Sequence, residues 1–250
     1  MTSARPSVLI VDGNALNRRL AEQFLLQAGC RCGLVPNGVE ALAAVVREAW
    51  GAVLVELNLP DQSGIDLARR LRQRVEEAGY PMPRIVALAD GGSARTRVLC
   101  RVAGIAAFLT RPLTLPALEE ALALRPAPFP APDPGLIRTL CGLRDMAGKN
   151  FVDDLIAILV REGPGRLAEI GGVLASGNLP AAGRLFHKMK GSAGSFGADE
   201  LTRLCEVGDE ACAEGNAALA SDCLRLAKEE LNDLGATLLR WKADGMEGEA

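Results

Sequence analysis

The chain has 250 residues, of which 49% are hydrophobic and 24% are charged, and its formal net charge at pH 7 is -3. This composition is typical of a folded protein with one or two domains, and it excludes a disordered chain. The slightly acidic balance also excludes the strongly basic surface that binds many phosphates, so no nucleic acid is expected as a partner.

Short apolar runs alternate with helical patterns in the first half of the chain. The runs at residues 8–11, 52–57, 85–88 and 105–109 are typical of buried parallel strands, and residues 30–35 are the expected second strand. Between the strands, apolar residues recur at helical spacing, as at Leu16, Leu20 and Phe24. This βα repeat predicts a doubly wound α/β sheet in a first domain, residues 1–124.

A proline-rich segment, residues 125–134, separates this half from the next. It has proline at every second position, which removes backbone donors and predicts an extended linker. Helical patterns then run to about residue 242, broken at residues 177–180, at 196–198 and near Gly215. Short breaks join antiparallel neighbours, so residues 135–243 are predicted to form an all-α antiparallel four-helix bundle with a short leading helix.

The cysteines and the apolar runs indicate the cellular compartment of the protein. Seven cysteines are scattered without two CxxC pairs, which predicts buried thiols and no zinc site. No stretch reaches the roughly 18 uninterrupted apolar residues that span a bilayer, and the first residues lack the pattern of a signal peptide. We therefore expect no membrane segment and a reducing, cytoplasmic location.

The predicted strand ends resemble those of response-regulator receiver domains. The segments VLIVDGN, LVELNLP, IVALAD and FLTRP follow one another in the order of that family, over about residues 7–124. The resemblance implies a flavodoxin-like, five-stranded sheet of order 2-1-3-4-5. It also implies a site in which two acids bind Mg²⁺, an aspartate accepts a phosphoryl group, and a Ser/Thr and a Lys sense it.

Most positions of that site are changed in this chain. Asp12 keeps the first acidic position, but Gly13 stands at the second and Glu56 at the phosphoacceptor position, while Ala89 replaces the hydroxyl residue and Arg111 the lysine. Because Mg²⁺ needs several oxygen ligands in a tight octahedron, we expect a degenerate pseudo-receiver that neither binds Mg²⁺ well nor accepts phosphate. Two interpretations of Glu56 stay open: a mimic of the phosphorylated state that reaches Arg111, or the decay of a disused site.

The second half contains a more specific motif. The segment LFHKMKGSAGSFGA, residues 185–198, resembles the phosphohistidine motif of histidine phosphotransfer (HPt) domains, and the resemblance covers about residues 134–241. Independently, about 100° per residue of helix places His187 opposite an apolar stripe. That stripe comprises Ala182, Leu185, Met189, Ala193 and Phe196. We therefore predict that His187, the one histidine of the chain, faces solvent and accepts the phosphoryl group.

Small and basic neighbours surround this histidine. Gly183 and Gly191 lie four residues to either side of it, and with Gly194 they are predicted to leave room for a bulky donor. Lys190 is predicted to hold the phosphoryl oxygens, and Arg184 to add to the positive field. No metal ligands are predicted, and the chain is expected to bind no cofactor. By the resemblance, an HPt domain takes Mg²⁺ and the reacting aspartate from its partner receiver.

Together the two halves predict phosphorelay signal transduction. The chain would be a phosphotransfer intermediate rather than a turnover enzyme, since it has no kinase ATP-binding motif. The expected partners are histidine kinases and response-regulator receiver domains, and the pseudo-receiver would dock a kinase, form a homodimer or gate access to His187. Two alternatives stay open: an unphosphorylated adaptor that binds histidine kinases or response regulators, and an enzyme that drains phosphate from a partner receiver by hydrolysis.

Overall fold

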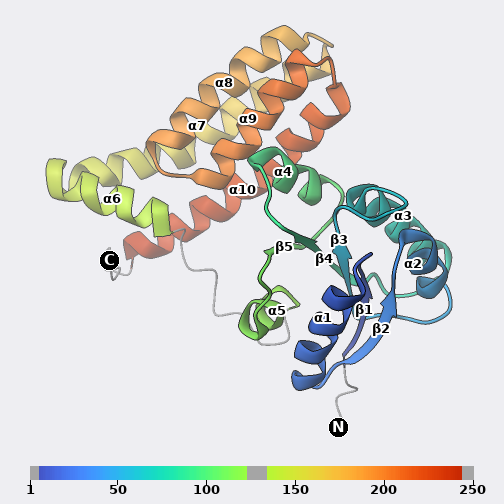
Figure 1. Cartoon of the computed structure of the whole chain (residues 1–250). Coiled ribbons are helices and arrows are strands. Elements are labelled where there is room, and N and C mark those ends of the chain that lie inside the picture. Colours follow the sequence, from blue (N-terminus) through green and yellow to red (C-terminus); the bar gives the residue numbers. More distant parts are fainter. Residues whose placement is uncertain (1–5, 123–133, 244–250) are drawn as a thin grey trace. The chain divides into compact units, whose positions relative to one another are not determined.

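The computed structural model describes residues 6–122 and 134–243, which are drawn as ribbon in Figure 1. The chain divides into two compact units, residues 1–127 and 128–250. This division falls inside the segment predicted as a linker, residues 125–134. That segment lies outside the described residues except for Pro134, which begins a helix, so its extended conformation stays a prediction.

The first unit is built on five parallel strands. They are β1 (Ser7–Val11), β2 (Arg31–Val35), β3 (Ala52–Glu56), β4 (Arg84–Ala89) and β5 (Ala107–Thr110). Their order in the sheet is β2-β1-β3-β4-β5, which confirms the predicted fold class. The inner strands are rich in Val, Leu and Ile and are buried on both faces, as parallel strands covered by helices require.

Five helices connect and cover these strands. They are α1 (Ala15–Gln27), α2 (Gly38–Val45), α3 (Gly64–Glu77), α4 (Ala94–Val102) and α5 (Leu115–Ala121). Each begins after a residue whose side chain accepts a hydrogen bond from a backbone N–H of the first turn, which satisfies donors that the helix itself leaves unpaired. These capping residues are Asn14, Asn37, Ser63, Ser93 and Thr114.

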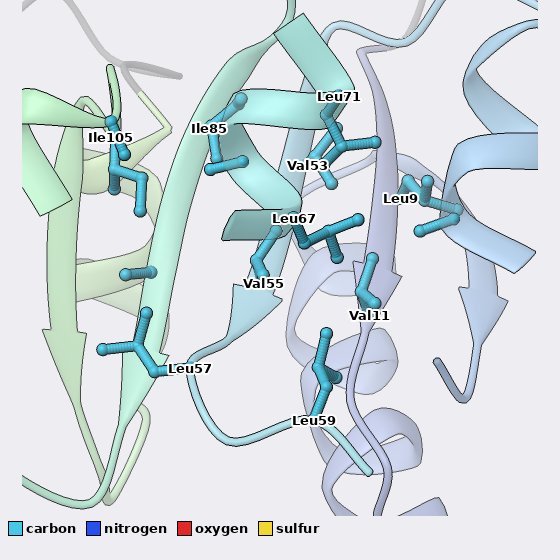
Figure 2. Close-up of a cluster of buried hydrophobic side chains, with 14 of the residues drawn as sticks. Leu9, Val11, Val53, Val55, Leu57, Leu59, Leu67, Leu71, Ile85 and Ile105 are labelled. Carbon is cyan, nitrogen blue, oxygen red and sulfur yellow. The ribbon is translucent and has the colours of Figure 1, made fainter. Parts of the chain in front are cut away.

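Alternate residues of the strands feed two hydrophobic cores, one on each face of the sheet. Val8 and Ile10 of β1 pack with Leu25 of α1 and Leu118 of α5. The intervening residues, with those of neighbouring strands, pack against α2, α3 and α4. Figure 2 shows this second core, in which Leu9, Val11, Val53, Val55 and Ile85 lie with Leu67 and Leu71 of α3. The two cores hold the sheet from both sides. The carboxyl ends of its strands, where Asp12, Glu56 and Arg111 lie, are therefore held close together.

The loop between β3 and α3 is fastened at this edge by Asp61. The two oxygens of the Asp61 carboxylate accept hydrogen bonds from the backbone N–H groups of Gly38 and Val39, each at 3.1 Å, at the start of α2. Burial raises the pKa of the Asp61 carboxyl, but these backbone hydrogen bonds outweigh it, so the pKa is lower than usual. The negative charge also suits the amino-terminal end of a helix.

We predict a pH-dependent contribution of Asp61 to stability. Because its pKa is lower in the folded state, the charged carboxylate stabilises the first unit above the unfolded-state pKa of about 4, and this contribution is lost as the pH falls through the folded-state pKa. Asp61→Asn keeps an acceptor oxygen but no charge, so it should be less stable than the parent near pH 7, and the difference should shrink as the pH falls below about 4. The difference should stay below about 1 kcal/mol because the side chain is exposed.

The measurement can use one tryptophan as a local reporter. The chain has two tryptophans, and both are buried, Trp50 in the first unit and Trp241 in the second. In a Trp241→Phe background, urea unfolding followed by fluorescence reports on the first unit alone. A stability difference between Asp61→Asn and its parent that stays constant from pH 7 to pH 3 would contradict the prediction.

The second unit is entirely helical within the described residues. It comprises α6 (Pro134–Ala147), α7 (Lys149–Ala175), α8 (Leu179–Ser195), α9 (Asp199–Ala213) and α10 (Ala217–Ala243). Helix α8 contacts α7 and α9, and α10 contacts α7 and α9, while α6 lies against α7. This is a four-helix bundle preceded by a further helix, as predicted. No helix among the described residues combines the length and apolar character of a bilayer-spanning segment.

Glycines end three of these helices at the predicted breaks. Gly177, Gly197 and Gly215 have φ values of 76°, 73° and 75°, a left-handed conformation that glycine adopts without steric cost. Each connection is therefore short, and it turns the chain back on itself. Consecutive helices from α7 to α10 thus become direct neighbours, which places α8 beside α9.

Candidate functional site

His187 lies on the solvent-facing side of α8, as predicted. Its side chain is 68% exposed, whereas the preceding Phe186 is fully buried and anchors the opposite face of the helix. The Nδ1 atom of His187 lies 3.1 Å from Oδ2 of Asp209. One ring nitrogen therefore has a partner within the bundle, and the imidazole as a whole stays open to a reactant.

Asp209 was not predicted from the sequence. It comes from α9, 22 residues further along the chain, so no spacing rule for a single helix could find it. A neutral imidazole that donates its Nδ1–H to a carboxylate keeps the lone pair on Nε2. The pair between His187 and Asp209 thus selects the ring tautomer whose Nε2 is free to act as a nucleophile.

The role predicted for Gly183 is wrong, because this glycine is buried rather than open. A Cβ atom at this position would lie 3.1 Å from Oδ1 of Asp209 and 3.3 Å from Cβ of Cys212. The missing side chain therefore lets α9 approach α8 and brings Asp209 to His187. By contrast, Gly191 is exposed with no atom within 4 Å of the same built position, and Gly194 has only Thr202 at 3.9 Å.

The two glycines flanking His187 should therefore respond differently to the same substitution. Gly183→Val is expected to destabilise the second unit by about 1–3 kcal/mol, because the added atoms force α8 and α9 apart. Gly191→Val adds its methyl groups in open space and should change stability by less than about 0.5 kcal/mol. Urea unfolding followed through Trp241 in a Trp50→Phe background measures both, and equal losses would contradict the assignment.

Two basic residues flank His187, as predicted, but one of them is already paired. The Nζ atom of Lys190 lies 3.4 Å from Oε1 of Glu206 on α9, with the lysine side chain 30% exposed. Arg184 is exposed on α8, one turn before His187. Lys190 lies three residues after His187 on α8, and an ion pair as exposed as the one between Lys190 and Glu206 contributes little to stability.

The residues at the carboxyl edge of the sheet form a second cluster. The guanidinium of Arg111 contacts Oδ2 of Asp12 and Oε2 of Glu56, each at 2.5 Å, and Oδ1 of Asp90 at 3.3 Å. Asp12 and Glu56 are only 2% and 8% exposed. Burial lowers the pKa of Arg111, but the three carboxylates outweigh it, so the pKa of this side chain is higher than usual.

The remaining positions of this cluster offer little to a metal ion. Ala89 is buried and has no hydroxyl, and a Cβ atom at Gly13 would lie 3.1 Å from Cδ of Pro60. Within residues 6–122 and 134–243, no group of three or more His, Cys, Asp or Glu side chains is placed to hold a metal ion. Neither Ala89 nor Gly13 therefore supplies a side-chain oxygen to a metal ion, and weak binding of Mg²⁺ by this unit stays a prediction. Glu56 does reach Arg111, which the mimic interpretation requires, but that interpretation itself stays a prediction.

Comparisons with known proteins agree with this division of the chain. A family profile described as "Response regulator receiver domain" matches residues 8–123, and one described as "Hpt domain" matches residues 154–237. The sensor histidine kinase RcsC of Salmonella typhi is 32% identical over 117 residues, which are 47% of this chain and 12% of that protein. The sensor protein GacS of Pseudomonas syringae pv. syringae is 27% identical over 262 residues, which are 98% of this chain and 28% of that protein.

Solved structures with similarity to this chain cover about half of it. A chain from the co-crystal structure of the Saccharomyces cerevisiae histidine phosphotransfer protein Ypd1 with the receiver domain of Ssk1 is 27% identical, with a TM-score of 0.44, and covers 49% of this chain and 90% of its own length. The receiver domain of sensor histidine kinase PA1611 from Pseudomonas aeruginosa PAO1, solved with a magnesium ion in its active-site cleft, is 27% identical, with a TM-score of 0.43, and covers 48% of this chain and 97% of its own.

Together the two family matches cover most of the chain, and each lies within one of the two structural units. The chain therefore consists of a response regulator receiver domain at residues 8–123 followed by an Hpt domain at residues 154–237.

Proposed function

We propose that the Hpt domain accepts a phosphoryl group on Nε2 of His187 from a histidine kinase or a partner receiver domain and passes it to an aspartate of another receiver. One observation carries the proposal: an exposed histidine, paired through Nδ1 with Asp209, lies within the residues matched by the Hpt profile. The chain is then a phosphotransfer intermediate in a phosphorelay, not a turnover enzyme.

The transfer needs only rearrangement of bonds to phosphorus. The Nε2 lone pair of His187 forms a bond to phosphorus while the bond between phosphorus and the donor atom breaks, and that electron pair stays with the donor. The Nδ1 proton stays on the ring because Asp209 holds it. In the second step, a carboxylate oxygen of the receiving aspartate attacks phosphorus, and the pair of the broken N–P bond returns to Nε2.

The charges around His187 support this role. The transferred group is anionic, and phosphoryl transfer depends on positioning and charge neutralisation more than on acid–base chemistry. Lys190 lies one helical turn from His187 and can exchange Glu206 for a phosphoryl oxygen. Arg184 adds positive charge on the other side, and the open surface at Gly191 leaves room for the donor.

The first unit enters this proposal as a docking or regulatory module. Because Glu56 stands where the phosphoacceptor would be and its oxygens are already engaged, the phosphoryl group comes from another chain. Mg²⁺, which receiver domains bind, would be supplied by the partner receiver. We also place the protein in the cytoplasm, which is supported by the absence of a disulfide among its seven cysteines.

The proposal is tested by incubating the full chain with a radiolabelled, phosphorylated receiver domain and Mg²⁺. Wild-type protein should acquire label that is stable to alkali and labile to acid, as expected for a phosphohistidine. His187→Gln should acquire none. Absence of label on the wild type would favour the adaptor, and release of free phosphate with little retained label would favour the draining enzyme; each result would overturn the relay.

A further inference from the structure

We infer that Arg111 serves as a built-in cation that replaces a divalent metal in the first unit. It holds the carboxyl ends of the strands in one arrangement, which responds neither to Mg²⁺ nor to a phosphoryl analogue. This inference concerns the pseudo-receiver alone and does not depend on phosphotransfer at His187.

All four oxygens of the two buried carboxylates already have partners inside the protein. Oδ1 of Asp12 accepts from the backbone N–H of Asn14 at 2.7 Å, and Oδ2 accepts from Arg111 at 2.5 Å. Oε1 of Glu56 accepts from the backbone N–H of Asn58 at 3.2 Å, and Oε2 accepts from Arg111 at 2.5 Å. A metal ion would have to displace the guanidinium before it could reach either acid.

The geometry of arginine suits this position. Its guanidinium presents several donors in a rigid plane and stays charged at every physiological pH, whereas the ammonium of a lysine is a single compact charge. Here one terminal nitrogen contacts Asp12 and the other contacts Glu56 and Asp90. The side chain of Arg111 is only 17% exposed and lies against the two buried acids, Asp12 and Glu56, while the side chain of Asp90 is 85% exposed.

This single side chain ties four strand ends together. Asp12 follows β1, Glu56 ends β3, Asp90 follows β4, and Arg111 itself follows β5. Because Asp90 begins the loop that leads into α4, the contact also restrains that loop. The arrangement of the strand ends is therefore set by an internal residue rather than by an ion from solution.

The aromatic ring of Phe108, three residues before Arg111, is held by contacts on two sides. Phe108 of β5 has the guanidinium of Arg97 over its ring at 4.5 Å from the centroid. On the loop, a Cβ atom at Gly92 would lie 2.6 Å from Cζ of Phe108, so the backbone closely approaches the ring. Rotation of Phe108 would require the Gly92 loop and α4 to move, and the contact between Arg111 and Asp90 opposes that motion.

Hydrogen exchange of the full chain, read by mass spectrometry, tests the inference. In the wild type, peptides that span residues 56–60 and 89–97 should exchange at the same rate with and without Mg²⁺ and beryllofluoride. In Arg111→Met, which keeps the length of the side chain but removes its charge, the same peptides should exchange at least about tenfold faster. Arg69→Met is the matched control, because it breaks an exposed pair with Asp66 on α3 of the same unit.

Two results would overturn the inference. One is a change in wild-type exchange on adding Mg²⁺ with beryllofluoride, and the other is an Arg111→Met protein that exchanges like the wild type. If Arg111→Met does not fold, Arg111→Lys decides the matter, because its ammonium cannot span both buried acids and should give intermediate exchange. Labelling of His187 is measured separately, so failure of one proposal leaves the other standing.

Discussion

Arg111→Met is expected to lower the free energy of unfolding of the first unit by about 3–5 kcal/mol. The reason is that Asp12 and Glu56, which are 2% and 8% exposed, would be left buried without the cation that they contact. Removing one partner of a buried ion pair lowers stability by more than the intact pair contributes to it. The remaining group is still buried away from water but no longer has an opposite charge beside it.

The loss is measured by urea unfolding through Trp50 in a Trp241→Phe background. A matched variant separates charge from packing: Glu56→Gln combined with Arg111→Met removes one buried charge along with the cation, so it should recover part of the lost stability. Arg69→Met, whose pair with Asp66 is exposed, should cost less than about 1 kcal/mol. If Arg111→Met and Arg69→Met lose equal stability, the cluster does not have the role assigned to it.

Phe186→Ala should destabilise the second unit by a similar amount, about 3–5 kcal/mol. Phe186 is 0% exposed and is the bulkiest of the fully buried side chains in the described part of the chain. Its ring lies against Gly208 of α9, where a Cβ atom would come within 2.7 Å of the ring. The ring therefore fills a space that exists only because position 208 has no side chain.

A pair of substitutions tests this fit directly. Gly208→Val alone should also destabilise the unit, because the rigid ring cannot yield to the added methyl groups. When Gly208→Val is combined with Phe186→Ala, the valine occupies part of the vacated space, so the double variant should be more stable than the sum of the two losses predicts. Strict additivity, measured through Trp241 in a Trp50→Phe background, would show that the two residues do not share that space.

The fold could be predicted because its signals are local. Runs such as residues 8–11 and 52–57 combine β-branched and aliphatic residues in the short lengths of buried strands, and apolar residues recur at helical spacing between them. In the second half, glycines such as Gly177 and Gly215 mark the helix ends. Such features depend on a few neighbouring residues, and the structure confirms them.

The site could be predicted only in part, because helical spacing ignores neighbouring helices. Helical spacing placed His187 on the exposed face correctly, but it assigned Leu185 to the core. In the structure Leu185 is half-buried, and Phe186 is the buried residue. It also assigned Gly183 to the open surface, since nothing on α8 alone reveals that α9 lies there. Asp209 was missed for the same reason: its relation to His187 exists only once the two helices pack.

The short helical connections have a consequence for the order of folding. Most helix contacts in the second unit join elements that are consecutive along the chain, whereas β1 of the first unit must pair with β3 across the whole of α1, β2 and α2. Low contact order favours rapid folding, and parallel pairing over a long loop slows it. The Hpt domain, although synthesised after the receiver domain, should therefore reach its native state faster than the receiver domain.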